Sequence, residues 1–255
     1  IRMLGEGRGY DVEPVILVAR DDEEYVRWIR EGQFDLTAMD PWLYVKHGLD
    51  PYVRLDAVAE DEQGLAKRFQ VVTRTDSGLN SMGRLAGKKI IARDLIHTDL
   101  GRQWLEALLT RGGFGTTGEF FGSFETSPKA SGVVLPVYFG VRDVALVDAG
   151  GLAAVVEQNA QVGRSLRTVA SSPRLSNLLM GTRNGRWPSE SHRAVVVEGV
   201  LDLESIPEGR RVLALFRIRR FVEVPENQLA SVRALHEGSV EVAADGARPA
   251  EDPGL

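Results

Sequence analysis

Strand-like and helix-like segments alternate along most of the chain, and this alternation constrains the fold more than any other feature of the sequence. Runs rich in Val, Ile and Leu, such as 12–18, 68–74 and 141–147, are separated by stretches with helical spacing of apolar residues. Such alternation predicts an α/β fold with mostly parallel sheets and flanking helices. In these sheets ligands bind at the carboxyl ends of the strands, so the strand-to-helix turns are the places to look for a site.

The individual elements follow from the same periodicity. The clearest helix is 98–111, where five large apolar residues form one stripe. The segment 130–138 fits a helix or a strand. Further strands are expected at 34–39, 88–92, 120–124, 166–170 and 178–182, and further helices at 21–31, 41–46, 151–158 and 190–203.

Composition excludes several classes of protein. The 255 residues are 43% hydrophobic and 26% charged, as in an ordinary globular chain. The net charge of −5 disfavours nucleic-acid binding, and no apolar run approaches the ~18 residues of a membrane helix. Because the chain has no cysteine and four histidines, we expect no soft-metal site, and no motif predicts a cofactor.

One strand-to-helix turn places Asp40, Trp42 and Tyr44 around a proline that begins a helix. An aromatic pair beside a carboxylate and free helix amides can bind a small polar ligand. The plain alternative is a helix start with ordinary core aromatics, which this turn taken alone favours.

A second turn contains His97, Thr98 and Asp99 before the clearest helix. A hydroxyl at a helix N-terminus suits an oxyanion, and the imidazole could donate a further hydrogen bond. Simple capping of the helix by Thr98, with His97 on the surface, explains the same residues equally well.

Two further loops contain residues that could bind an anion or a nucleotide. Ser127 and Lys129 precede the segment 130–138 and could form another anion site, although an exposed loop explains them too. The segment 113–118 matches the pattern G-x-G-x-x-G. It follows a predicted helix, whereas a dinucleotide fingerprint follows a strand, so we expect no nucleotide to bind there.

Several motifs, in this order, resemble the phosphonate-type periplasmic substrate-binding proteins of ABC transporters. The segment 34–44 (FDLTAMDPWLY) is similar to a strand that runs into G-P-x-x-Y in that family. The segments 69–78 (FQVVTRTDSG), 82–90 (MGRLAGKKI), 113–121 (GFGTTGEFF) and 141–148 (VRDVALVD) resemble later family motifs, and 176–183 resembles the return to the first lobe. The similarity covers about residues 10–205.

The resemblance implies a two-lobed fold of the type II periplasmic-binding-protein class, with a ligand cleft and a hinge of two crossing strands. Lobe I would comprise 1–75 and 171–240, lobe II 76–170, and 241–255 a flexible tail. It also implies that the family's first strand precedes Ile1. By the same resemblance the ligand-binding residues extend to Asp148.

The resemblance implies a solute-binding protein, not an enzyme, that serves an ABC transporter permease in the periplasm or another extracytoplasmic place. Where the family commonly carries a hydroxyl cluster and Gly-Pro, this chain has Asp99 and Asp40, which would repel a phosphonate dianion. We therefore expect a small polar ligand that is less anionic than phosphonate. The prediction also includes a ligand that carries an oxyanion group. The alternatives are an enzyme on this fold, with Asp40, His97 and Asp99 as acid or base, and a sensor or assembly component without transport function.

Overall fold

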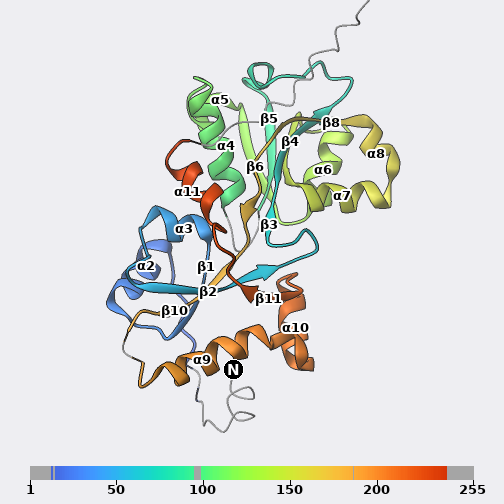
Figure 1. Cartoon of the computed structure of the whole chain (residues 1–255). Coiled ribbons are helices and arrows are strands. Elements are labelled where there is room, and N and C mark those ends of the chain that lie inside the picture. The colour runs from blue at the N-terminus through green and yellow to red at the C-terminus, as the bar shows by residue number, and fades with distance from the viewer. Residues whose placement is uncertain (1–12, 14, 95–98, 186, 240–255) are drawn as a thin grey trace, which may run out of the picture. The chain divides into compact units, whose positions relative to one another are not determined.

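The chain folds into two compact units, each described here by itself (Figure 1). The computed structural model describes residues 13, 15–94, 99–185 and 187–239. The first unit comprises 1–67 and 175–237, and the second comprises 68–174 and 238–255. The segment 68–74 lies in the second unit, where its strand pairs with two others. The predicted tail at 241–255 lies outside the described residues.

The first unit contains a four-stranded sheet in the order β1-β10-β2-β11, in which every neighbouring pair is antiparallel. A small antiparallel pair, β3 with β9, belongs to the same unit. Its strands are β1 (Leu36–Met39), β2 (Val53–Glu60), β3 (Ala66–Lys67), β9 (Leu175–Ser176), β10 (Leu179–Arg183) and β11 (Arg220–Glu223). Its helices are α2 (Asp22–Glu31), α3 (Pro41–Lys46), α9 (Glu190–Leu201), η2 (Leu203–Ser205), α10 (Pro207–Leu215) and α11 (Ala230–His236).

Local sequence signals explain the ends of α2. Asp21 caps its N-terminus by accepting a hydrogen bond from the amide of Glu24 at 2.8 Å. Gly32 ends the helix with φ of 69°, a left-handed conformation that glycine adopts without a steric penalty. The predicted helix 21–31 is thereby confirmed.

The second unit contains a five-stranded sheet in the order β6-β5-β7-β4-β8. Its strands are β4 (Phe69–Arg74), β5 (Lys89–Arg93), β6 (Ser123–Ser127), β7 (Val144–Asp148) and β8 (Leu166–Ser171). Its helices are η1 (Met82–Leu85), α4 (Leu100–Arg111), α5 (Thr117–Phe120), α6 (Ala130–Tyr138), α7 (Ala149–Gln158) and α8 (Ala160–Ser165). The strand β5 is parallel to β6 and β7, whereas β4 is antiparallel to β7 and β8.

Helices cover both faces of this sheet. On one face α6, α7 and α8 pack on the buried side chains of β4, β5 and β7, and α4 and α5 lie on the other face (Figure 1). Val133, Val134 and Val137 of α6 are fully buried in this core. The segment 130–138, which fitted a helix or a strand, is therefore a helix, even though it contains a proline.

The α/β class is confirmed, but three expectations about the strands are wrong. The sheets are not mostly parallel, because among the described strands only the pairs β5 with β6 and β5 with β7 are parallel. The described residues of 12–18 form no strand, and Val15 to Val18 are exposed. The predicted strand 120–124 divides into the end of α5 and the start of β6, since Thr116 caps α5 in a capping box with Glu119. No helix among the described residues is both long and apolar enough to cross a bilayer.

Candidate functional site

A cavity of about 290 Å³ opens in the second unit beside the carboxyl ends of β5 and β6 and the start of α4. Because β5 and β6 are parallel, both strands deliver their last residues to the same edge of the sheet. The lining combines two cations, two carboxylates and two aromatic rings with smaller groups: Phe69, Ala92, Arg93, Asp94, Asp99, Gly101, Arg102, Phe124, Thr126 and Leu146.

A buried ion pair forms the base of this region. Arg93, the last residue of β5, contacts Asp148, the last residue of β7, and their side chains are 7% and 3% exposed. Asp148 also caps α7, accepting a hydrogen bond from the amide of Gly151 at 2.8 Å. A Cβ on Gly151 would lie 2.4 Å from Nη1 of Arg93, so glycine is required for the guanidinium to approach the helix this closely.

Arg93 has a donor without a partner in the part of the chain that the structure describes. Its Nε is buried and has no hydrogen-bond acceptor among the described residues. A buried donor without a partner costs about 1–3 kcal/mol, so a ligand or water that accepts from it would be favoured. Arg93 also lines the cavity.

The start of α4 supplies the rest of the polar lining. Asp99 accepts a hydrogen bond from Nε2 of Gln103 at 2.7 Å, and the guanidinium of Arg102 lies 5.5 Å from the ring centre of Phe124. A Cβ on Gly101 would lie 2.6 Å from the ring of Phe69, which shows how closely this helix approaches the sheet. The cavity thus places opposite charges beside flat apolar walls.

The predicted residues of the second unit lie in different surroundings. His97 and Thr98 fall outside the described residues. Ser127 ends β6, where its carbonyl accepts from the amide of Asp94 at 3.0 Å, and Lys129 is exposed in front of α6. Neither Ser127 nor Lys129 is among the lining residues of the cavity.

The predicted residues of the first unit gather at the end of β1. The carboxylate of Asp40 caps α3, accepting from the amide of Trp42 at 2.6 Å, and the Trp42 ring contacts the His236 ring at 5.5 Å. Tyr44 is 3% exposed. Burial, together with the nearby carboxylate of Asp50, raises the pKa of Tyr44 well above its usual value, so this phenol stays neutral.

The cavity residues that sequence reasoning missed include Arg93, Arg102 and Phe124. Arg93 had a usable signal, because a basic residue that ends a buried strand of a parallel pair must lie at the ligand-binding edge. Arg102 and Phe124 had none, since an arginine on a helix and an aromatic residue in a strand are common everywhere. Among the described residues no cluster of His, Cys, Asp and Glu could hold a metal ion.

A family model described as the periplasmic substrate-binding protein of phosphonate ABC transporters matches residues 1–229. A search of curated proteins found no significant match. Among solved structures, a Xanthomonas citri protein bound to chloride ion is 16% identical with a TM-score of 0.67, over 93% of this chain and 88% of that one.

Two further solved structures have a TM-score of 0.60. PhnD1 from Prochlorococcus marinus, in complex with methylphosphonate, is 14% identical over 92% of this chain and 88% of that one. A binding-protein component of an ABC phosphonate transporter from Pseudomonas aeruginosa is 16% identical over 92% of this chain and 77% of that one. At these identities the structures show the fold alone, which is the two-lobed α/β fold of type II periplasmic binding proteins.

Proposed function

Because the chain belongs to the phosphonate-type periplasmic substrate-binding proteins of ABC transporters, we propose that it captures a small polar solute for an uptake permease. Proteins of this family work outside the cytoplasm, and we propose the same place for this one. The cavity at the carboxyl ends of β5 and β6 is the part of the chain that best supports solute binding.

The observation that carries the proposal is a cavity lined by two arginines, Arg93 and Arg102, and by two carboxylates. The arginines favour a ligand with an oxygen acceptor. Asp94 and Asp99 favour a ligand that also carries a positive charge. We therefore propose a small zwitterion as the ligand.

The balance of charge argues against a plain dianion. The charge of Arg93 is already compensated by Asp148, which leaves Arg102 against Asp94 and Asp99 in the lining. Among the described lining residues this leaves an excess of one negative charge, which would repel a phosphonate dianion more strongly once water is displaced. An ammonium group on the ligand would remove that excess.

The remaining predicted ligand-binding residues stay predictions. They are His97, Thr98, Ser127 and Lys129 in the second unit, and Asp40, Trp42 and Tyr44 in the first unit. We propose Asp148 as a residue that holds Arg93 in position for the ligand, because its own carboxylate is buried and engaged.

Titration calorimetry of the full chain with methylphosphonate and 2-aminoethylphosphonate tests the ligand class. We expect the aminated compound to bind at least about tenfold more tightly, since one charge-assisted hydrogen bond contributes about 1.5–3 kcal/mol. Asp94→Asn should reduce this preference, and Arg102→Gln should weaken both ligands. Arg164→Gln, an exposed arginine of α8, is the matched control and should change neither affinity. Tighter binding of methylphosphonate than of its aminated analogue would contradict the proposed ligand class.

A further inference from the structure

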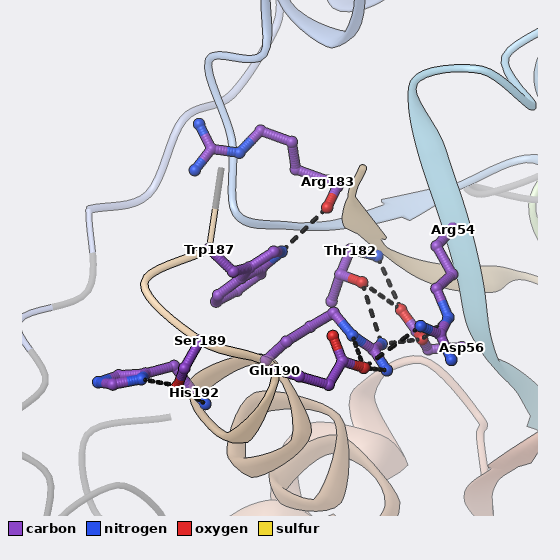
Figure 2. A network of polar contacts seen from close by, with 9 residues as sticks. Arg54, Asp56, Thr182, Arg183, Trp187, Ser189, Glu190 and His192 are labelled. Carbon is purple, nitrogen blue, oxygen red and sulfur yellow. Dashed lines mark hydrogen bonds and ion pairs between the residues drawn. The ribbon is translucent and has the colours of Figure 1, made fainter. Parts of the chain in front are cut away.

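A second cavity, of about 250 Å³, opens in the first unit at the N-terminus of α9 (Figure 2). It lies at the opposite end of the sheet from Asp40. The antiparallel register places Thr182 beside Leu36 at the start of β1, whereas Asp40 follows the last residue of that strand. Three arginines and one carboxylate line this second cavity, and Asp35 and Asp56 behind the lining also pair with these arginines. The full lining is Arg54, Arg183, Asn184, Gly185, Trp187, Ser189, Glu190 and Arg193.

The carboxylate of Glu190 lies between two arginines of this cavity. Its Oε1 accepts hydrogen bonds from Nε and Nη2 of Arg193, at 2.8 and 2.6 Å, and from Nη1 of Arg54 at 3.3 Å (Figure 2). The Glu190 side chain is nevertheless 69% exposed. One carboxylate oxygen is therefore held by two guanidinium groups in a position that a dissolved anion can reach.

A buried carboxylate also contacts one of these cations, through a guanidinium nitrogen that Glu190 does not use. Asp56, whose side chain is 6% exposed, contacts Nη1 of Arg193 at 2.5 Å. Its other oxygen accepts from the amide of Thr182 at 2.9 Å and from the Thr182 hydroxyl at 2.6 Å. Because Arg193 is oriented from behind, its guanidinium needs little rearrangement to bind an incoming anion.

Trp187 provides a flat apolar wall of the same cavity. The indole Nε1 donates to the carbonyl of Arg183 at 2.9 Å, which fixes the ring (Figure 2). An apolar ring of a ligand can stack on this face, while the positive end of the α9 macrodipole adds to the attraction for an anion.

We propose that this cavity binds a small organic anion with a flat apolar part, whose carboxylate or phosphate takes the place of Glu190 between Arg54 and Arg193. The inference goes beyond solute capture for transport, because it concerns other residues in the other unit. In the empty protein Glu190 acts as an internal competitor for the site.

Titration of the full chain with benzoate, followed by the ¹H–¹⁵N signals of its indole groups, tests the inference. The signal that disappears in Trp187→Phe identifies Trp187. We expect benzoate to shift this signal, and inorganic phosphate, which has no ring, to bind more weakly. Equal affinity for phosphate and benzoate would overturn the role of Trp187.

Two substitutions should act in opposite directions. Glu190→Gln removes the internal carboxylate and should tighten benzoate binding, whereas Arg54→Gln should weaken it, each by about tenfold. Glu125→Gln is the matched control, because Glu125 is an exposed glutamate paired with Arg142 in the second unit, and it should change nothing. Arg102→Gln should also leave benzoate binding unchanged, which separates this site from the proposed solute cavity.

The inference is overturned if the Trp187 signal does not move in either the wild-type protein or Glu190→Gln at about 10 mM benzoate, a ligand concentration that detects binding weaker than 1 mM. It is also overturned if Glu190→Gln leaves the affinity unchanged, since the arginines would then serve only to fasten α9 to the sheet. Far-UV circular dichroism of each variant confirms that the fold is intact.

Discussion

The two units each contain a buried arginine–aspartate pair, but the pairs differ in what surrounds them. In the second unit Arg93 and Asp148 form a closed pair, with side chains 7% and 3% exposed. In the first unit Arg193 is shared between buried Asp56 and exposed Glu190, which also contacts exposed Arg54. One pair is almost entirely buried, and the other continues to the solvent.

The difference shows how one ion pair can position a helix while another can exchange a partner. Asp148 both caps α7 and neutralises Arg93, so removing it leaves a buried charge without compensation. Glu190 can leave Arg193 without that penalty, because Asp56 remains in contact and water reaches the vacated position. Four substitutions, taken from the largest expected effect to the smallest, test this comparison.

Asp148→Ala should produce the largest effect, a loss of about 3–5 kcal/mol from the free energy of unfolding of the second unit. The buried guanidinium of Arg93 would lose its carboxylate, and α7 would lose its cap. Urea unfolding followed by circular dichroism measures the loss.

Two controls separate the charge from the cap. Asp148→Asn keeps an oxygen that can accept from the amide of Gly151 and should recover only about 1 kcal/mol, the usual contribution of a cap. Replacing Arg93 by Met together with Asp148→Ala should recover more, because no uncompensated charge remains. A double variant less stable than Asp148→Ala would contradict the account of the closed pair.

Asp56→Ala should have the next largest effect, a loss of about 2–3 kcal/mol from the first unit, because the amide and hydroxyl of Thr182 both lose their acceptor. Arg193 keeps Glu190, so the loss should stay below that of Asp148→Ala. The same urea titration provides the comparison. A loss larger than that of Asp148→Ala would contradict the comparison, because the first unit would then tolerate the loss of its buried aspartate less well than the second unit does.

Gly151→Ala should cost about 1–2 kcal/mol, because its Cβ would lie 2.4 Å from Nη1 of Arg93 and 3.0 Å from the Cβ of Ala130. Gly118→Ala in α5 is the matched control, since no atom lies within 4 Å of the position of its added Cβ. Thermal unfolding of both variants distinguishes crowding from helix propensity, which favours alanine at both positions. Equal stability of the two variants would contradict the close approach of Arg93.

The sequence predicted most elements of the fold but not the arrangement of the strands. Helices with a cap and an apolar stripe, such as α2 and α4, were found because their signals are local. The strand β2 was missed, since its alanines and acids have low β propensity and its stability comes from pairing with β10 and β11. Strand direction was mispredicted because antiparallel return strands, like parallel strands, follow helices in the sequence.

The candidate site was predictable only in part. Strand-to-helix turns indicated the correct edge of the second unit's sheet, but the cavity there contains Arg93 and Phe124, which we had not singled out. The arginines around Glu190 belong to β2, β10 and α9, so their convergence depends on tertiary structure and no spacing in the sequence reveals it.

Glu190→Gln should have the smallest effect on stability, and that effect should depend on pH. The hydrogen bonds from Arg193, and then the charges of Arg193 and Arg54, hold the pKa of Glu190 below its usual 4.5. A lowered pKa in the folded state means that the carboxylate stabilises the fold above the unfolded pKa, and that this contribution is lost as the pH falls through the folded pKa.

The stability difference between wild type and Glu190→Gln should therefore be constant near neutral pH and shrink below about pH 5. Unfolding midpoints measured across that range provide the test. Added salt should shrink the difference too, because this carboxylate is largely exposed and its charge is screened. A difference that persists unchanged in strong acid and in high salt would mean that Glu190 stabilises α9 by packing, and the contrast with the closed pair of the second unit would then fail.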